Sequence, residues 1–343
     1  MVKQLLQGNE AICLGALKAG MKFFAGYPIT PASEIMHFLA KRKDTTFVHA
    51  EDELASMNMI IGSSLGGAKS MTATSGPGFS LKQEGIGLAH MMEVPAVVVN
   101  CQRVGPSTGM PTLGAQGDIL QSAYGSHGDI FPIVLYPNSV EECYIYTIEA
   151  FNAAEQSRSP VILMTDTSIS HIYETIDTDE IDKKIKIQPR TLKPFGTGTR
   201  HFTGLAHEGD IPKTKDTENY RKWMKNYKKK QLEAANNYNF YEYFGKKDSD
   251  TLLIAYGITS RVISPLKEKF AIFRPIRMFP ILQELKDIAG KYKNIIVIEQ
   301  NEGQYKHEID ALLKKEVKGI YIHGGTILLS EIKEKLKSLG IEK

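Results

Sequence analysis

The chain has 343 residues, of which 42% are hydrophobic and 24% are charged, and its formal net charge at pH 7 is +3. This length predicts two domains, each large enough to bury a core. The nearly balanced charge gives no reason to expect nucleic acid, a membrane surface or a strongly acidic partner. No apolar run approaches the roughly 20 residues that a membrane-spanning helix needs, and no secretion signal opens the sequence. We therefore expect a cytoplasmic protein.

The three cysteines, at positions 13, 101 and 143, are scattered along the chain. Their small number is typical of a reducing compartment. No Cys-x-x-Cys pair occurs, so these residues alone cannot hold an iron–sulfur cluster or a structural zinc ion. Cys101 has no evident histidine partner, and we interpret it as a buried core residue. We expect no metal site in this chain.

The first 180 residues alternate helix-like segments with short apolar runs. A helical pattern extends from about residue 9 to 20, and others follow the runs described below. Continuous β-branched runs separated by helices are typical of a parallel sheet that is covered on both faces. The sequence therefore predicts an α/β fold. We expect its strands at residues 22–25, up to about 48, and at 70–73, 96–100, 133–135 and 161–164.

Residues 181–248 have a different texture, lysine-rich and with few apolar runs. Within them Tyr220, Trp223 and Tyr227 recur at the spacing of one helix face. This favours a helix that docks its aromatic face on protein over a nucleic-acid patch, because acidic residues also punctuate the segment. A second α/β unit then begins, with strands expected at 251–256, 275–278, 294–298 and 319–322. The chain thus divides into residues 1–180, a linker and excursion at 181–248, and a smaller domain at 249–343.

Ligands of an open parallel sheet bind at the carboxyl ends of its strands, so the loops there carry the candidate chemistry. Residues 27–31 read Tyr-Pro-Ile-Thr-Pro. Thr30 before Pro31 is typical of an N-cap and a first helical residue, which would aim a helix N-terminus at an anion. The simpler interpretation is that Thr30 only caps the helix.

An acidic triplet, Glu51, Asp52 and Glu53, follows the next strand. It is either a well-placed acidic first turn or a positioned acid/base. Further on, Ser75-Gly76-Pro77-Gly78 is either a tight turn or a place where backbone approaches a ligand closely.

Arg103 follows the apolar strand at 96–100 and opens a loop rich in glycine, proline, serine and threonine. It is either a clamp for a carboxylate or an ordinary loop arginine. His127 stands alone in a later loop, and we interpret it as a surface residue.

Taken together, the loops resemble the alpha subunit of 2-oxoacid:ferredoxin oxidoreductases, and most closely the 2-oxoglutarate branch. The resemblance is dense over residues 8–175, thins through the excursion and returns more loosely in the last 95 residues. It rests on four segments in order, at residues 26–31 (GYPITP), 51–56 (EDELAS), 73–80 (ATSGPGFS) and 102–109 (QRVGPSTG).

The resemblance implies a reaction: oxidative decarboxylation of a 2-oxo acid with coenzyme A, giving an acyl-CoA, carbon dioxide and reduced ferredoxin. Thiamine diphosphate is the electron sink, and iron–sulfur clusters carry the electrons away. Residues 1–180 would form the domain that binds the aminopyrimidine end of thiamine diphosphate. The last 95 residues would form a domain like the C-terminal domain of transketolase.

The resemblance also implies roles for single residues. Glu53, with Glu51 as the alternative, matches the glutamate that bonds a pyrimidine nitrogen and helps a weakly acidic carbon lose its proton. Arg103 matches the arginine that binds the substrate carboxylate, and Thr30 and Thr112 match two threonines on the substrate side. The residues placed against the cofactor are Pro28, Ile29, Glu53, Ser75 and Gly76.

The chain lacks a Gly-Asp-Gly signature followed by paired asparagines, which binds magnesium and diphosphate in this family. The resemblance therefore implies a beta subunit that holds Mg²⁺ and the diphosphate. The [4Fe-4S] clusters would lie on partners too, either the beta subunit or a ferredoxin-like delta subunit, with a gamma subunit and ferredoxin as further partners. Two alternatives stay open: a substrate that is pyruvate or a branched-chain 2-oxo acid, and a catalytically silent scaffold subunit. The second cation that a five-carbon diacid needs is not identified.

Overall fold

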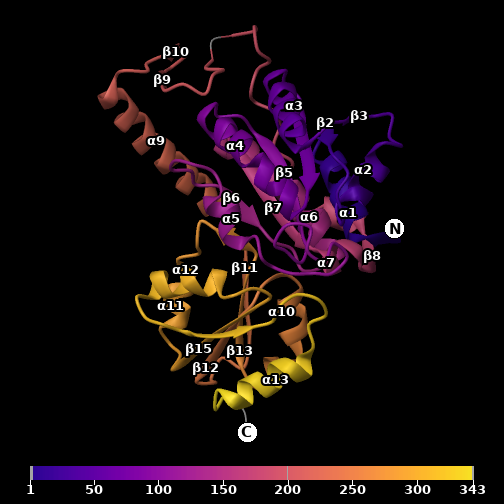
Figure 1. Cartoon of the computed structure of the whole chain (residues 1–343), viewed down its shortest axis with the longest axis vertical. Coiled ribbons are helices and arrows are strands. Elements are labelled where there is room, and N and C mark those ends of the chain that lie inside the picture. The colour runs from indigo at the N-terminus through magenta and orange to yellow at the C-terminus, as the bar shows by residue number, and fades with distance from the viewer. Residues whose placement is uncertain (1–2, 199, 342–343) are drawn as a thin grey trace.

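The computed structural model describes residues 3–198 and 200–341. It has two α/β units, one above the other in Figure 1, with the C-terminus at the far end of the lower one. The first unit is built on a seven-stranded sheet and the second on a five-stranded sheet. The α/β class predicted from the sequence is confirmed. In the described part of the chain, no helix is long and apolar enough to cross a membrane.

The seven-stranded sheet has the order β14-β6-β7-β5-β4-β2-β3. Six strands are parallel to their neighbours, and only β14 at one edge runs antiparallel, against β6. Every residue of β4, β5, β6 and β7 is buried, as the continuous apolar runs predict for strands covered on both faces. The strands are β2 (Met21–Gly26), β3 (Thr46–His49), β4 (Lys69–Thr74), β5 (Ala96–Gln102), β6 (Ile133–Leu135), β7 (Pro160–Asp166) and β14 (Arg277–Phe279).

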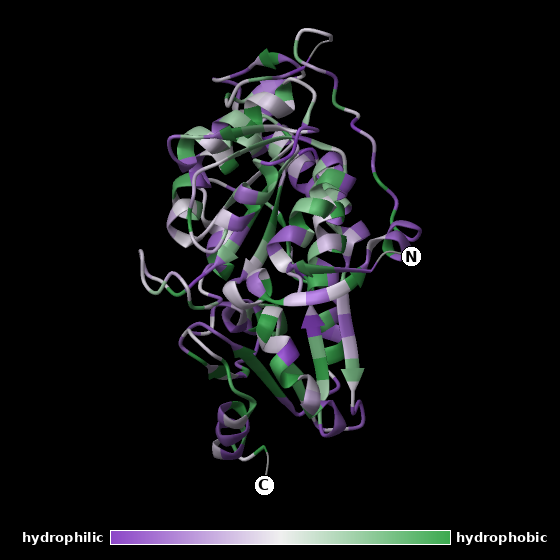
Figure 2. Cartoon of the chain, turned by 90° about the vertical axis from the view of Figure 1, so that its right-hand side faces the viewer, coloured by the Kyte–Doolittle hydropathy of each residue, from purple (hydrophilic) through white to green (hydrophobic). Residues whose placement is uncertain are grey.

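Helices cover both faces of this sheet. On one face α1 (Gly8–Lys18), α2 (Ser33–Leu39) and α6 (Val140–Ser157) share a core with the strands. On the other face α3 (Glu53–Leu65) and α4 (Gly76–Met91) lie side by side and bury a second core. The central strands are drawn largely in the colour of hydrophobic residues in Figure 2, as expected for a doubly covered sheet.

The excursion is more ordered than its composition predicts. A small hairpin of β9 (His207–Glu208) and β10 (Ile211–Pro212) precedes the long helix α9 (Thr217–Ala235), which runs along one side of the first unit in Figure 1. Tyr227 of α9 is buried, and its hydroxyl lies 2.6 Å from Nδ1 of His90 on α4. Trp223 stacks on Tyr227 with ring centroids 5.1 Å apart. The predicted docking of an aromatic helix face on protein is confirmed.

The five-stranded sheet has the order β11-β13-β12-β15-β16. Its first strand, β11 (Tyr241–Gly245), lies within the segment expected to be linker and pairs antiparallel with β13. The second unit therefore begins near residue 241. One strand that follows in the chain, β14, pairs with β6 in the sheet of the first unit. Its elements are β12 (Thr251–Ile254), α10 (Gly257–Ile263), β13 (Ala271–Pro275), α11 (Glu284–Ala289), β15 (Asn294–Glu299), α12 (Gln304–Leu313), β16 (Lys318–Tyr321) and α13 (Leu329–Ser338).

Short elements complete the chain. The strands β1 (Lys3–Gln7) and β8 (Tyr173–Asp177) form an antiparallel pair at the edge of the first unit. The remaining helices are α5 (Ile119–Tyr124), α7 (Thr167–His171), α8 (Thr178–Asp182), η1 (Asn236–Tyr238) and η2 (Ser264–Glu268).

Candidate active site

The loops that follow β2, β3, β4 and β5 gather at the carboxyl edge of the first sheet. Two contacts tie them together. Arg103 Nη1, after β5, donates to the carbonyl oxygen of Thr30, after β2, at 2.7 Å. Glu53, after β3, reaches over the first turn of α4, where its carboxylate lies beside Gly78. The structure thus joins these loops in two pairs, Arg103 with Thr30 and Glu53 with the glycine turn at Gly78.

Thr30 is not a helix cap, which corrects the interpretation made from the sequence. The helix α2 begins at Ser33 with Ala32 as its N-cap. Thr30 instead lies in a turn closed by a hydrogen bond from Ala32 N to Ile29 O (2.8 Å), and its peptide bond to Pro31 is cis. The first residue of α2 thus comes three positions after Thr30, so the helix N-terminus predicted at this residue is not found there.

The three residues of the acidic triplet have different surroundings. Asp52 is the N-cap of α3, and its Oδ1 accepts a hydrogen bond from Ala55 N at 2.6 Å. Glu51 is exposed. Glu53 is the first residue of α3 and is only 6% exposed, yet no hydrogen bond or ion pair reaches its carboxylate from residues 3–198 or 200–341. Its oxygens are not among the fully buried, unpartnered atoms, so the carboxylate stays open to a donor from a bound group.

Gly78 makes room for that carboxylate. A Cβ at this position would stand 2.3 Å from Glu53 Oε1 and 2.2 Å from Thr74 Oγ1. Beside it, Ser75 is the N-cap of α4, and its buried hydroxyl has no partner in the described residues. By contrast, a Cβ at Gly76 would meet Asp118 at an ordinary 3.5 Å. The tight contact at this turn is therefore between Gly78 and the Glu53 side chain, and the approach of Gly76 to a ligand stays a prediction.

Arg103 is 8% exposed, and its Nε is buried without a partner in the described chain. Burial lowers the pKa of this guanidinium, and the charge of Asp118 acts against that shift. Asp118 itself accepts a hydrogen bond from Asn100 Nδ2 at 2.9 Å, and its pKa is raised by burial, against the effects of Asn100 and Arg103. Arg103 Nη2 makes no hydrogen bond within the described residues and is not among their buried atoms.

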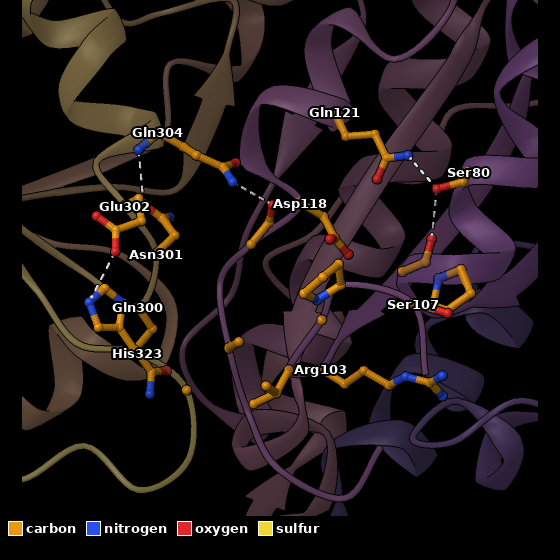
Figure 3. Close-up of a pocket in the computed structure, with 18 residues that line it drawn as sticks. Ser80, Arg103, Ser107, Asp118, Gln121, Gln300, Asn301, Glu302, Gln304 and His323 are labelled. Atoms are coloured by element: carbon orange, nitrogen blue, oxygen red, sulfur yellow. Dashed lines mark hydrogen bonds and ion pairs between the residues drawn. The ribbon is translucent and has the colours of Figure 1, made fainter. Parts of the chain in front are cut away.

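A cleft of about 730 Å³ opens between Arg103 and the second unit. Arg103, Asp118 and Gln121 line it from the first unit, and Glu302 and His323 line it from the second (Figure 3). His323 Nε2 lies 3.0 Å from Glu302 Oε1. The sequence did not identify Asp118 or the second unit's residues, although Asp118 lies in the loop after β5, Glu302 follows β15 and His323 follows β16.

Polar side chains fasten the second unit to the loop that carries Asp118. Asn301 Nδ2 donates to Gln116 O at 2.7 Å, and Gln304 Nε2 donates to Gly117 O at 2.6 Å. Gln116 Nε2 donates in return to Tyr256 O at 2.9 Å. These bonds fix the wall of the cleft across the two units.

The remaining predicted residues lie less centrally. Thr112 is exposed in the loop after β5, and no contact joins it to Thr30 or Arg103 within the described residues. Pro28 is exposed, whereas Ile29 packs against the core of the first unit. In residues 3–198 and 200–341 no cluster of three His, Cys, Asp or Glu side chains could hold a metal ion.

Known proteins resemble this chain along its whole length. It is 38% identical to the 2-oxoglutarate synthase subunit KorA of Archaeoglobus fulgidus, over 97% of this chain and 98% of the relative. It is 39% identical to the protein of that name from Methanocaldococcus jannaschii, over 92% of this chain and 93% of the relative. It is also 33% identical to the ketoisovalerate oxidoreductase subunit VorB of Methanothermobacter marburgensis, over 100% and 99% of the two chains.

A solved structure shares the fold of nearly the whole chain. The 2-oxoglutarate:ferredoxin oxidoreductase from Magnetococcus marinus, with 2-oxoglutarate, coenzyme A and succinyl-CoA bound, superposes with a TM-score of 0.91 at 30% identity. The match covers 98% of this chain but 65% of that one, so the present chain spans about two thirds of that protein's length. A split-gene transketolase in an inactive tetramer shares the fold alone, with a TM-score of 0.59 and 11% identity.

A family model decides the assignment. The model described as pyruvate flavodoxin/ferredoxin oxidoreductase, thiamine diphosphate-binding, matches residues 14–242. This span includes the whole parallel sheet of the first unit except β14, together with Glu53, Arg103 and the excursion. The chain belongs to the thiamine diphosphate-binding family of pyruvate flavodoxin/ferredoxin oxidoreductases.

Proposed function

We propose that this chain is the alpha subunit of a 2-oxoglutarate:ferredoxin oxidoreductase that acylates coenzyme A, and that it supplies the pyrimidine side of a shared thiamine diphosphate site. The observation that carries the proposal is the carboxylate of Glu53, a residue only 6% exposed, which lies beside Gly78 and has no partner in the described chain. A ring N–H of the cofactor would give that carboxylate the hydrogen-bond donor that the described chain does not offer. The residues present therefore fit the group.

Glu53 is the proposed acid/base residue. Thiamine diphosphate, when bound, supplies a carbon nucleophile and an electron sink for the carbonyl carbon of the substrate. Glu53 would hold the pyrimidine ring and keep a proton at its Oε atoms within reach of the ring nitrogen. Gly78 would keep the space over that carboxylate open. The proposed cofactor contacts also include Pro28, Ile29, Ser75 and Gly76.

Arg103 is the proposed clamp for the substrate carboxylate, with Thr30 and Thr112 beside it. The hydrogen bond from Arg103 Nη1 to Thr30 O holds the arginine side chain in place. Other guanidinium donors remain free for two parallel hydrogen bonds. The reaction is balanced as follows: a 2-oxo acid and the thiol of coenzyme A give a thioester, carbon dioxide, one proton and two electrons. Those electrons leave singly to ferredoxin. 2-Oxoglutarate is favoured over a branched-chain acid because the KorA relatives are more similar to this chain than VorB.

We expect a partner subunit to cover the site. Large apolar side chains stand exposed around it, with Tyr27 at 39%, Leu54 at 45% and Leu81 at 47%. Such a rim is typical of a surface that another chain covers. The relatives are themselves named as subunits. The proposed partner is a beta subunit that holds Mg²⁺, the diphosphate and a [4Fe-4S] cluster, with gamma and ferredoxin-like delta subunits as further components.

The test is an anaerobic assay of this chain co-expressed with its beta partner. The complex is purified, loaded with thiamine diphosphate, and assayed for reduction of a viologen dye with coenzyme A and either 2-oxoglutarate, pyruvate or 2-oxoisovalerate. We expect reduction that needs coenzyme A and prefers 2-oxoglutarate, and we expect Glu53→Gln to reduce it by at least about 100-fold. A preference for another acid would overturn the substrate but keep the reaction. No reduction by a cofactor-loaded complex would overturn the enzymatic proposal and favour a silent scaffold.

A further inference from the structure

Lys82 is a lysine with no solvent exposure on α4, on the side that packs against α3. Its Nζ donates to the main-chain carbonyl oxygen of Glu53 at 3.2 Å and also to Ser56 Oγ. The Ser56 hydroxyl donates in turn to the same Glu53 carbonyl at 3.0 Å. The three groups form a closed triangle under the first turn of α3. Nζ therefore holds the main chain of the residue that carries the free carboxylate.

The ammonium group of Lys82 is buried without an ion-pair partner in the described chain. Burial lowers its pKa to about 7, and the charges of Glu53 and then Asp52, both at the start of α3, act against that shift. The strands beneath α4 present one further charged residue, Asp166 of β7, which does not act on Lys82. A methionine would fill this space without the cost of burying a charge. A cation kept here at such a cost indicates a role in the neighbouring site.

We propose that Lys82 is a positioning residue for Glu53: it holds the Glu53 main chain through its carbonyl oxygen, and with it the place of the carboxylate. This inference rests on the role proposed above for Glu53. Without the Nζ donor, the affinity of the complex for thiamine diphosphate should fall even where the complex stays folded.

The experiment measures the affinity of the purified alpha–beta complex for thiamine diphosphate by calorimetry, at fixed Mg²⁺ and fixed pH. Four proteins are compared: wild type, Lys82→Met, Lys82→Arg and Ser56→Ala. Methionine keeps the length but removes the donor, and arginine keeps a donor. Ser56→Ala removes one oxygen partner of Nζ but leaves the bond to Glu53 O in place.

We expect Lys82→Met to weaken thiamine diphosphate binding by about 10-fold, because Nζ no longer donates to Glu53 O. Lys82→Arg can still donate and should recover part of the affinity, and Ser56→Ala should lose less than Lys82→Met. A folded Lys82→Met complex that binds as tightly as the wild type overturns the proposal. Equal losses in Lys82→Met and Lys82→Arg also overturn it, because the donor would then not be the cause.

The two proposals fail in different ways. If Glu53→Gln binds and turns over like the wild type, then the role of Glu53 is wrong and Lys82 has nothing to position. If Glu53→Gln is inactive while Lys82→Met binds thiamine diphosphate like the wild type, only the inference about Lys82 fails. Thermal unfolding of each complex, measured in parallel, shows whether a variant is folded.

Discussion

Gly78 and Glu53 lie so close that a Cβ on residue 78 would stand 2.3 Å from Glu53 Oε1 and 2.6 Å from Glu53 Cγ. The first atom could swing aside, but the second is near the base of the side chain, so the whole side chain would have to leave its place. The closeness of the Glu53 side chain therefore explains the glycine at position 78. A positive φ does not explain it, because the φ of Gly78 is not in the positive region.

Gly78→Ala should weaken thiamine diphosphate binding by on the order of 10- to 100-fold, because overpacking displaces the Glu53 carboxylate. The measurement is calorimetric titration of the alpha–beta complex. Gly62→Ala is the matched control: it lies on the same helix as Glu53, its Cβ would meet no described atom within 4 Å, and binding should change less than threefold. Equal losses in both variants would show that the contact with Glu53 is not the cause.

Arg103→Ala should raise the Michaelis constant for the 2-oxo acid by about 10- to 100-fold, because two charge-assisted hydrogen bonds to the substrate carboxylate are lost. The affinity for thiamine diphosphate should change little. Arg103→Lys keeps the charge but loses the planar fork, so an intermediate increase is expected. An unchanged Michaelis constant in Arg103→Ala would place the carboxylate clamp elsewhere.

The burial that raises the pKa of Asp118 makes the folded state hold its proton to higher pH than the unfolded chain does. The contribution of this group to stability is thus fully present below the unfolded pKa and is lost as pH rises through the folded one. Asp118→Asn, whose amide oxygen can still accept from Asn100, should lose less stability between pH 4.5 and 7 than the wild type. Thermal unfolding midpoints of the complex at the two pH values measure this, and a larger loss in the variant contradicts the direction of the shift.

Much of the first unit could be predicted from its sequence because doubly buried strands leave a direct signal. The runs at Val97–Val99 and Val161–Leu163 are apolar at every position, and both became central strands. The second unit was harder to delimit. Its edge strand β11 alternates half-buried and exposed residues and follows a lysine-rich helix, so nothing in the composition separates it from the linker.

The residues of the candidate site were also only partly predictable from the sequence. Glu53 and Arg103 follow strands and could be identified from their place in the loops. Lys82 could not, because one lysine on a helix face is normally solvated, and only packing of α4 on α3 reveals that its Nζ lies under Glu53. Gly78 was separated from Gly76 only by the positions of the atoms around them. Such roles depend on contacts between elements that are distant in the sequence. These contacts cannot be read from a single sequence.

The joint between the two units depends on Asn301, which is 7% exposed and uses both ends of its amide. Nδ2 donates to Gln116 O at 2.7 Å and to the Tyr256 hydroxyl at 3.0 Å, and Oδ1 accepts from the N–H groups of Gly303 and Gln304 at 2.8 and 2.9 Å. Asn301→Ala would leave buried polar groups unpaired on both units, so it should lower the free energy of unfolding by about 2–4 kcal/mol.

Chemical denaturation of the complex measures this loss, and Glu302→Gln is the matched control one residue away. Glu302 is exposed and pairs only with His323, which is exposed as well, so its loss should change the free energy of unfolding by less than about 1 kcal/mol. Because Gln116 and Gly117 form the wall that presents Asp118 to the cleft, Asn301→Ala should also raise the Michaelis constant for the 2-oxo acid or for coenzyme A. If stability falls and both constants stay unchanged, the joint supports the fold without shaping the cleft.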